Sequence, residues 1–228
     1  MTTVSKVLIG KLMQLGSCGT VSGINKTPIT GKIHLGSKGL TGDAQGDLKY
    51  HGGVEKALHH YPAEHYCEWL HRLVDPSVNI APGAFGENIS TEGMSEDHVA
   101  IGDTFRLGGA LIQVSQGRQP CWKLNVRFGI EDMAARVQQL GLTGWYYRVL
   151  ESGYIEEGAE VGLVDRTNPQ WTIRRLWRAF YVDTLNASEL SEIVTLQALP
   201  DSWKKYARNR LETGKVEDWE RRLKGNVQ

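Results

Sequence analysis

Short runs of alternating apolar and polar residues, separated by glycines, dominate the chain up to about residue 168. The segment 99–116 holds two such runs, rich in β-branched residues, on either side of Gly108-Gly109, which predicts a β-hairpin. A second hairpin is predicted at Ser152-Gly153. Because closure leaves no exposed strand edge, many short strands with glycine turns favour a closed or nearly closed barrel.

Two segments within this region repeat apolar residues at helical spacing instead. In 62–73, Pro62 suits the first helical position, where a missing N–H leaves no hydrogen bond unmade. In 130–140, the pattern ends before Gly141, which suits the C-terminal cap. The expected apolar faces comprise Tyr66, Trp69, Leu70 and Leu73 in the first helix, and Ile130, Met133, Ala134, Val137 and Leu140 in the second.

The chain changes character near Asn168-Pro169, because proline disfavours helix in the residue before it. Of the 26 glycines, 24 lie in residues 1–168, and this unit holds 15 basic and 18 acidic side chains against 11 and 8 in residues 169–228. The second unit shows helical spacing throughout. The expected N-caps of its three short helices are Thr172, Ser188 and Asp201. We therefore predict a mainly β barrel domain with interspersed helices over 1–168, followed by a small three-helix domain over 169–228.

The charge balance and the lengths of the apolar runs exclude several classes of function. The 228 residues carry 26 basic and 26 acidic side chains, and this zero net charge argues against a general nucleic-acid binder. No apolar run approaches the roughly 18–20 residues that cross a bilayer. A lysine interrupts the apolar start of the chain, which disfavours a secretory signal. We expect a cytoplasmic protein without nucleic-acid or membrane partners.

A histidine zinc site is disfavoured by spacing. His59, His60 and His65 are close in sequence but form no HExxH motif. Pro62 interrupts the segment, and two adjacent residues in a strand point to opposite faces of a sheet. The three cysteines lack CxxC spacing, which excludes a disulfide scaffold and a four-cysteine zinc site. These histidines are therefore expected in packing or surface roles.

Two glycine-containing segments are candidates for ligand binding. In 46–61, the pair Gly52-Gly53 allows a close backbone approach to an anion, and His51 and Lys56 would balance its charge. The alternative is a hairpin turn with solvated polar residues.

The segment 83–91 places glycines on both sides of Phe85, followed by Glu87 and Asn88. This arrangement would bring a carboxylate and an amide to the mouth of a pocket. The alternative is a tight turn closed by the same two residues.

The segment 115–125 carries the strongest chemical signal. Cys121 follows a predicted strand, with Arg118 and Lys123 within three residues, and cationic neighbours favour the reactive, metal-ligating thiolate. A buried structural cysteine is the alternative. Cys18 and Cys67 lack such neighbours, and Cys67 is expected to pack on its amphipathic helix. The motifs of a phosphate loop, a dinucleotide-binding turn and a nucleophile elbow are missing from the sequence.

Taken together and in order, these segments resemble the MOSC domain, the module named after the C-terminal part of molybdenum-cofactor sulfurase, and within that family the YiiM-like bacterial group. The resemblance covers nearly the whole chain. The matching segments are 39–53, 56–69, 82–91, 101–116, 118–125 and, in the helical tail, 202–223. The aminotransferase-like portion of the fused sulfurases is missing from the chain, so sulfur generation that depends on pyridoxal phosphate is not expected.

The resemblance implies a MOSC-type β-barrel that binds the molybdenum cofactor, a molybdopterin whose dithiolene holds the metal. Cys121 matches the cysteine that ligates the metal in the family and is expected to be catalytic. Residues expected to line the cofactor groove are His51, Gly52, Gly53, Lys56, Asn88, Arg118 and Lys123. Glu87 or a nearby histidine is the expected proton relay.

The resemblance also implies two-electron reduction of N-hydroxylated compounds, such as hydroxylaminopurines, to the amine. Because no flavin or iron–sulfur motif is present, electrons must come from a separate flavin reductase. Two other functions remain open: a carrier of sulfur or cofactor that uses a Cys121 persulfide or metal bond without turnover, and a non-catalytic ligand-binding barrel that recruits a protein partner. The sequence leaves the oligomeric state open, a homodimer included.

Overall fold

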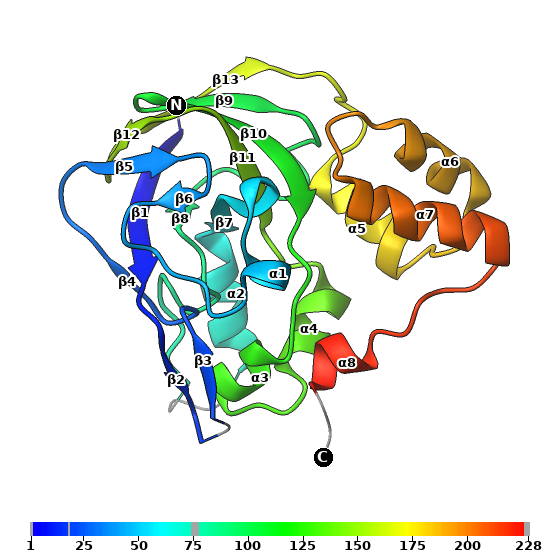
Figure 1. The fold of residues 1–228 in the computed structure, drawn as a ribbon, viewed down its shortest axis with the longest axis horizontal. Helices are drawn as coiled ribbons and strands as arrows, with labels where there is room; N and C mark the ends of the chain where they lie inside the picture. Colours follow the sequence, from blue (N-terminus) through cyan, green and yellow to red (C-terminus); the bar gives the residue numbers. More distant parts are fainter. Residues whose placement is uncertain (1, 18, 74–77, 226–228) are drawn as a thin grey trace.

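Seven strands close into a barrel in the computed structural model, which describes residues 2–17, 19–73 and 78–225 (Figure 1). Their order is β13-β9-β10-β11-β7-β8-β1, and β1 pairs with β13 to close the ring. The barrel strands are β1 (Thr2–Gly10), β7 (Leu58–Pro62), β8 (Ile89–Thr91), β9 (Thr104–Leu107), β10 (Ala110–Gly117), β11 (Trp145–Glu151) and β13 (Glu160–Asp165). The β7–β8 pair is parallel, and the other barrel pairs are antiparallel. The predicted closed barrel is confirmed.

The two predicted hairpins have different outcomes. β9 and β10 form the first, with Leu107 opposite Ala110 across the glycine pair. The second prediction is wrong, because β12 (Gly153–Ile155) pairs with β5 (Ile33–Gly36) and not with β11. A Cβ at Gly153 would lie 2.3 Å from the carbonyl carbon of Gly109. Gly153 is therefore needed for a close approach to the β9–β10 turn.

The segment between β1 and β7 forms short strands and helices. They are β2 (Met13–Leu15) paired with β3 (Thr20–Ser22), β4 (Lys26–Pro28) paired with β1, β6 (Gly39–Leu40) paired with β5, α1 (Leu48–His51) and the 3₁₀ helix η1 (Val54–Lys56). The segment with the paired glycines thus joins two short helices rather than forming a hairpin.

The two predicted barrel helices exist as α2 (Glu64–Arg72) and α4 (Met133–Leu140), and a further helix, α3 (Lys123–Phe128), follows β10. Pro62 was expected to begin a helix, but it is the last residue of β7 and pairs with Thr91 of β8. Gly141 is the left-handed C-cap of α4, as predicted. The exposed Cys67 and Leu70, the latter 55% exposed, do not pack as expected, because the buried face of α2 is formed by His65, Tyr66 and Trp69.

The C-terminal region contains α5 (Ile173–Tyr181), α6 (Ala187–Thr195), α7 (Asp201–Thr213) and the short α8 (Glu220–Lys224). Figure 1 shows α5–α7 grouped at one side of the barrel, whereas α8 returns toward α3 and α4. Thr172 caps α5 as predicted, since its Oγ1 accepts a hydrogen bond from Arg175 N. The Ser188 prediction is wrong: Asn186 caps α6. Asp201 is the first residue of α7, whose N-cap position is Pro200.

Two apolar clusters hold these elements together. The larger runs from the barrel interior into α5–α7 without interruption, joining Trp145 and Tyr147 to Phe180 and Trp203. The smaller lies among α2, α3 and α4 around Phe85. Among the described helices, none has both the length and the apolarity needed to cross a bilayer. Cys18 lies outside the described residues.

Candidate functional site

A cavity of about 620 Å³, its open mouth included, lies where β3, α1, η1, the loop before β8 and the loop after β10 meet. Six of the nine residues predicted for the site line it: His51, Lys56, Asn88, Arg118, Cys121 and Lys123. Lys26 and His59 also line the wall. None of the described lining residues is acidic. The cavity is therefore suited to an anionic ligand.

Cys121 reaches the cavity because the chain turns sharply between β10 and α3. β10 ends at Gly117 and α3 begins at Lys123, so Cys121 stands in the connecting loop. Its side chain is 8% exposed. Its Sγ lies 3.3 Å from His51 Nε2. The thiol is thus held in contact with an imidazole at the cavity wall, not enclosed in hydrocarbon.

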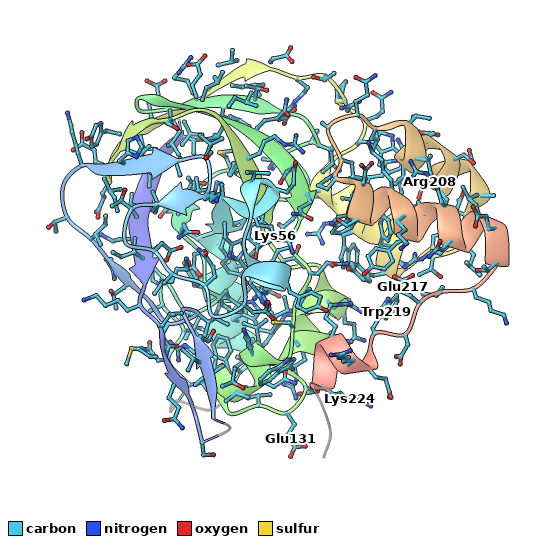
Figure 2. The ribbon with its side chains drawn as sticks, viewed as in Figure 1. Lys56, Glu131, Arg208, Glu217, Trp219 and Lys224 are labelled. Carbon is cyan, nitrogen blue, oxygen red and sulfur yellow. The ribbon has the colours of Figure 1, made fainter. Side chains whose placement is uncertain are left out.

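Positive charge surrounds this contact. Burial, followed by the charges of Lys123 and Lys56, lowers the pKa of His51 to about 4, so the imidazole is neutral at pH 7. Burial also lowers the pKa of Lys56, although the nearby Cys121 opposes the shift. Lys56 Nζ donates a hydrogen bond to Tyr50 O at 2.6 Å. Figure 2 labels Lys56 near α1, at the centre of the view.

Three buried nitrogen atoms of the lining residues have no hydrogen-bond partner within the part of the chain that the structure describes. They are His51 Nδ1, His59 Nε2 and Arg118 Nη1. An unsatisfied buried polar atom costs about 1–3 kcal/mol. Three of them on one cavity indicate a ligand with several polar or anionic atoms. This donor set, together with an accessible thiol, fits a phosphorylated pterin whose metal takes a sulfur ligand.

Lys26 is a site residue that the sequence did not reveal. Its Nζ lies 2.6 Å from Asp43 Oδ2, and the same carboxylate oxygen accepts a hydrogen bond from Asn88 Nδ2 at 2.9 Å. Asn88 Oδ1 in turn accepts one from His59 N. Burial lowers the pKa of Lys26, opposed by Asp43. No motif surrounds Lys26, which is brought to the cavity by the pairing of β4 with β1.

His59 and His60 are neighbours in β7 and point to opposite sides, as expected of a strand. His59 faces the cavity. His60 contacts Tyr147 Oη at 2.9 Å and Thr91 Oγ1 at 2.8 Å in the interior. His65 Nε2 lies 2.8 Å from Oε2 of the buried Glu96, and neither residue lines the cavity.

Glu87 and the paired glycines do not reach the cavity wall. The fully buried carboxylate of Glu87 accepts hydrogen bonds from Tyr66 Oη, Gly83 N and Phe85 N, so it holds the loop before β8 in shape. Burial raises the pKa of this carboxyl. These hydrogen bonds give Glu87 a positioning role in the loop before β8. Gly52 and Gly53 lie between α1 and η1, outside the lining residues.

Two known protein domains match this chain, one over most of the barrel and one over the helices that follow it. The MOSC domain matches residues 47–162, and the YiiM-like 3-alpha helix domain matches residues 171–214. The chain belongs to the MOSC domain family, with the helical extension of its YiiM-like group. The predicted family is thereby confirmed.

Individual relatives agree with this assignment. The chain is 39% identical to protein YiiM of Escherichia coli K12 over 207 residues, which cover 91% of this chain and 92% of that protein. It is 34% identical over 191 residues to a protein named Reductase from Gibberella moniliformis, covering 83% of this chain and 34% of the longer protein. The crystal structure of YiiM from Escherichia coli superposes with a TM-score of 0.81 at 34% identity, covering 97% and 98% of the two chains. That of YiiM from Geobacillus stearothermophilus gives 0.79 at 33% identity, covering 92% and 100%.

Proposed function

We propose that this chain binds the molybdenum cofactor through Cys121 and reduces N-hydroxylated compounds. The observation that carries the proposal is the position of Cys121 in the wall of a basic cavity with three unpartnered buried nitrogens. Membership of the MOSC family and the likeness to a protein named Reductase support it. When bound, the cofactor supplies two-electron redox chemistry.

The residues around Cys121 have separate tasks in this proposal. Cys121 must lose its proton to act as a ligand. The ring of His51 is neutral at pH 7, and its Nε2 lies 3.3 Å from Sγ, within hydrogen-bond distance, so this nitrogen orients the sulfur. Lys56 and Lys123 stabilise the resulting thiolate. Arg118 Nη1, buried and unpartnered, binds an anionic group of the cofactor.

The proposed reaction breaks one N–O bond. The N-hydroxylated substrate takes up two electrons and two protons and yields the amine and one water molecule. We propose that a separate flavin reductase supplies the electrons, because the sequence carries no flavin or iron–sulfur motif. Small N-hydroxylated molecules, such as hydroxylaminopurines, are the proposed substrates.

The first test compares the full chain with Cys121→Ser, produced in a host that makes the cofactor. We expect near-equal amounts of molybdenum, pterin and wild-type protein, and at least a tenfold loss of molybdenum in the variant, since a hydroxyl is a poorer ligand than a thiolate. Cys67→Ser is the matched control, because that thiol is exposed on α2 away from the cavity. Wild-type metal content and reductase activity in Cys121→Ser would remove this residue from the mechanism.

Two other outcomes separate the alternative functions. An additional sulfur on Cys121 by mass spectrometry, in protein without molybdenum, would support a persulfide carrier in place of the reductase. A cofactor-loaded sample that leaves every N-hydroxylated compound unchanged, even with a chemical reductant, would support a non-catalytic binding barrel.

A further inference from the structure

The segment that follows α7 returns from the helices to the loop that carries Cys121. We call residues 215–225 the C-terminal strap; they follow α7 and include α8. Figure 2 shows Glu217, Trp219 and Lys224 along this path, and in Figure 1 α8 lies beside α3 and α4. The strap lies beyond the two ranges that match known domains, which end at residues 162 and 214.

The strap is anchored at its start to the helical region. Glu217 forms an ion pair with the buried Arg210 at 2.7 Å, and Arg210 also donates to Phe180 O at 3.1 Å. The Trp219 ring packs edge-on against Tyr181, with ring centroids 5.3 Å apart. These contacts fix the direction in which the strap leaves α7.

Arg222 then holds the backbone on both sides of Cys121. Its carbonyl oxygen accepts a hydrogen bond from Trp122 N at 2.8 Å, and its Nη1 donates to Pro120 O at 2.6 Å. Its Nη2 donates to Gln138 Oε1 of α4 at 2.5 Å. One residue of the strap thus joins the residue before Cys121, the residue after it, and a helix of the barrel domain.

A second contact holds the residue before Pro120. Gln119 lines the cavity, and its Nε2 donates to Tyr181 Oη at 3.1 Å. The Tyr181 ring lies 5.8 Å from the Arg222 guanidinium, close enough for a cation–π contact. Residues 119, 120 and 122 are therefore all bound to Arg222 or to its aromatic neighbour.

We propose that Arg222 is a positioning residue that fixes Cys121 Sγ against His51, so that the C-terminal strap controls access to the thiol. Without these bonds the loop between β10 and α3 would leave its observed position more often, and the 3.3 Å contact with His51 Nε2 would be broken. The functional importance of the thiol rests on the proposed function, but its accessibility can be measured independently.

The test measures alkylation of Cys121 by iodoacetamide in the full chain without cofactor, with Cys18 and Cys67 both replaced by serine. We expect Arg222→Ala to raise the second-order rate at least about fivefold, because charge-assisted hydrogen bonds to the loop are lost. Arg222→Lys, which keeps one donor near Pro120, should restore part of the protection. The matched control is Arg221→Ala, since Arg221 is the exposed neighbour on the same helix. The alkylation rate of this variant should stay within about twofold of the rate of the parent protein, because most surface substitutions have small effects.

A second variant keeps the test decisive if Arg222→Ala does not fold. Tyr181→Phe removes only the hydroxyl that accepts from Gln119, and it should raise the rate at least about twofold, the lower limit expected for the loss of one neutral hydrogen bond. Parent-like rates in every foldable variant of Arg222 and Tyr181, or equal acceleration by Arg221→Ala, would overturn the proposal. The assay contains no molybdenum, so its result does not depend on whether the reductase proposal is correct.

Discussion

At the scale of single residues, one step along β7 separates a histidine that lines the cavity from one that lies in the interior. His59 points into the cavity with an unpartnered Nε2. His60 points inward, and both of its ring nitrogens have hydroxyl partners. Since side chains alternate along a strand, this difference follows from position alone. Burial lowers both pKa values, and the charge of Arg118 adds to the shift at His59.

His60 gives the first prediction, which concerns pH. Burial lowers its pKa to about 3, against 6.5 for an unshifted histidine, so the unfolded state binds the proton first as pH falls. Its contribution to stability is therefore constant above pH 6.5 and falls between 6.5 and 3, by about 2 kcal/mol at pH 5. His60→Gln should reduce the stability difference between pH 7 and pH 5, measured by urea unfolding, by about that amount. The control is His71→Gln, at an exposed histidine, which should keep the wild-type difference in stability between pH 7 and pH 5. If His60→Gln loses as much stability between these pH values as the wild type does, the prediction is wrong.

Gly23 gives a second prediction at this scale. It lines the cavity opposite Ala44, and a Cβ at this position would lie 1.8 Å from Ala44 O, so the backbone would have to move. Gly23→Ala should destabilise the protein by at least about 2 kcal/mol in urea unfolding. Gly162→Ala is the control, because a Cβ placed at Gly162 would have no described atom within 4 Å and the φ of this residue is not left-handed. Equal stability of the two variants would show that the cavity wall adapts freely.

At the scale of elements, the sequence predicted several features that depend on neighbouring residues, although it missed the cap of α6. The β9–β10 hairpin and the Gly141 cap depend on neighbouring residues and were predicted correctly. The β12–β5 pairing joins segments far apart in the chain, and no local pattern encodes it. Pro62 was misassigned because the ladder with β8 outweighs a favourable helix start.

The residues of the candidate site also fall into two groups: those that the local sequence could predict and those that it could not. Cys121, Arg118 and Lys123 come from one continuous segment, so the sequence could group them in advance. Lys26 enters through strand pairing, without a motif, and could not be found in this way. Glu87 was predicted at the mouth of the pocket because it follows the glycines that flank Phe85, but its carboxylate accepts a hydrogen bond from the backbone of its own loop.

The cap of α6 allows a prediction at this scale. Asn186 Oδ1 accepts a hydrogen bond from Glu189 N at 3.2 Å, whereas Ser188 lies inside the helix and is exposed. Asn186→Ala should therefore lower the free energy of unfolding by about 1 kcal/mol, and Ser188→Ala should change it by less than about 0.5 kcal/mol. Chemical denaturation of both variants checks this. If Ser188→Ala lost more unfolding free energy than Asn186→Ala, Ser188 would be the N-cap of α6, as the sequence predicted.

At the scale of the whole molecule, the barrel and α5–α7 share one apolar cluster and are also joined by buried hydrogen bonds. Trp203 Nε1 of α7 donates to Gln116 Oε1 of β10 at 2.7 Å, and Gln116 Nε2 donates to Glu55 O beside Lys56. Arg148 of β11 contacts both Glu55 and Ala198 O. The helical region thus supports the cavity wall through the backbone that positions Lys56.

These shared contacts predict that the barrel and α5–α7 unfold together. Hydrogen exchange in increasing urea should give the slowest peptides of β10 and α7 the same opening free energy within about 1 kcal/mol, because neither region can leave the common core without exposing the other. Trp203→Phe keeps the aromatic packing but leaves Gln116 Oε1 buried without its donor, so it should lower both opening free energies together, by about 1–3 kcal/mol. If α7 opened at lower urea while β10 stayed protected, the helices would be a separate folding unit, and their support of the cavity would be lost before the barrel itself opens.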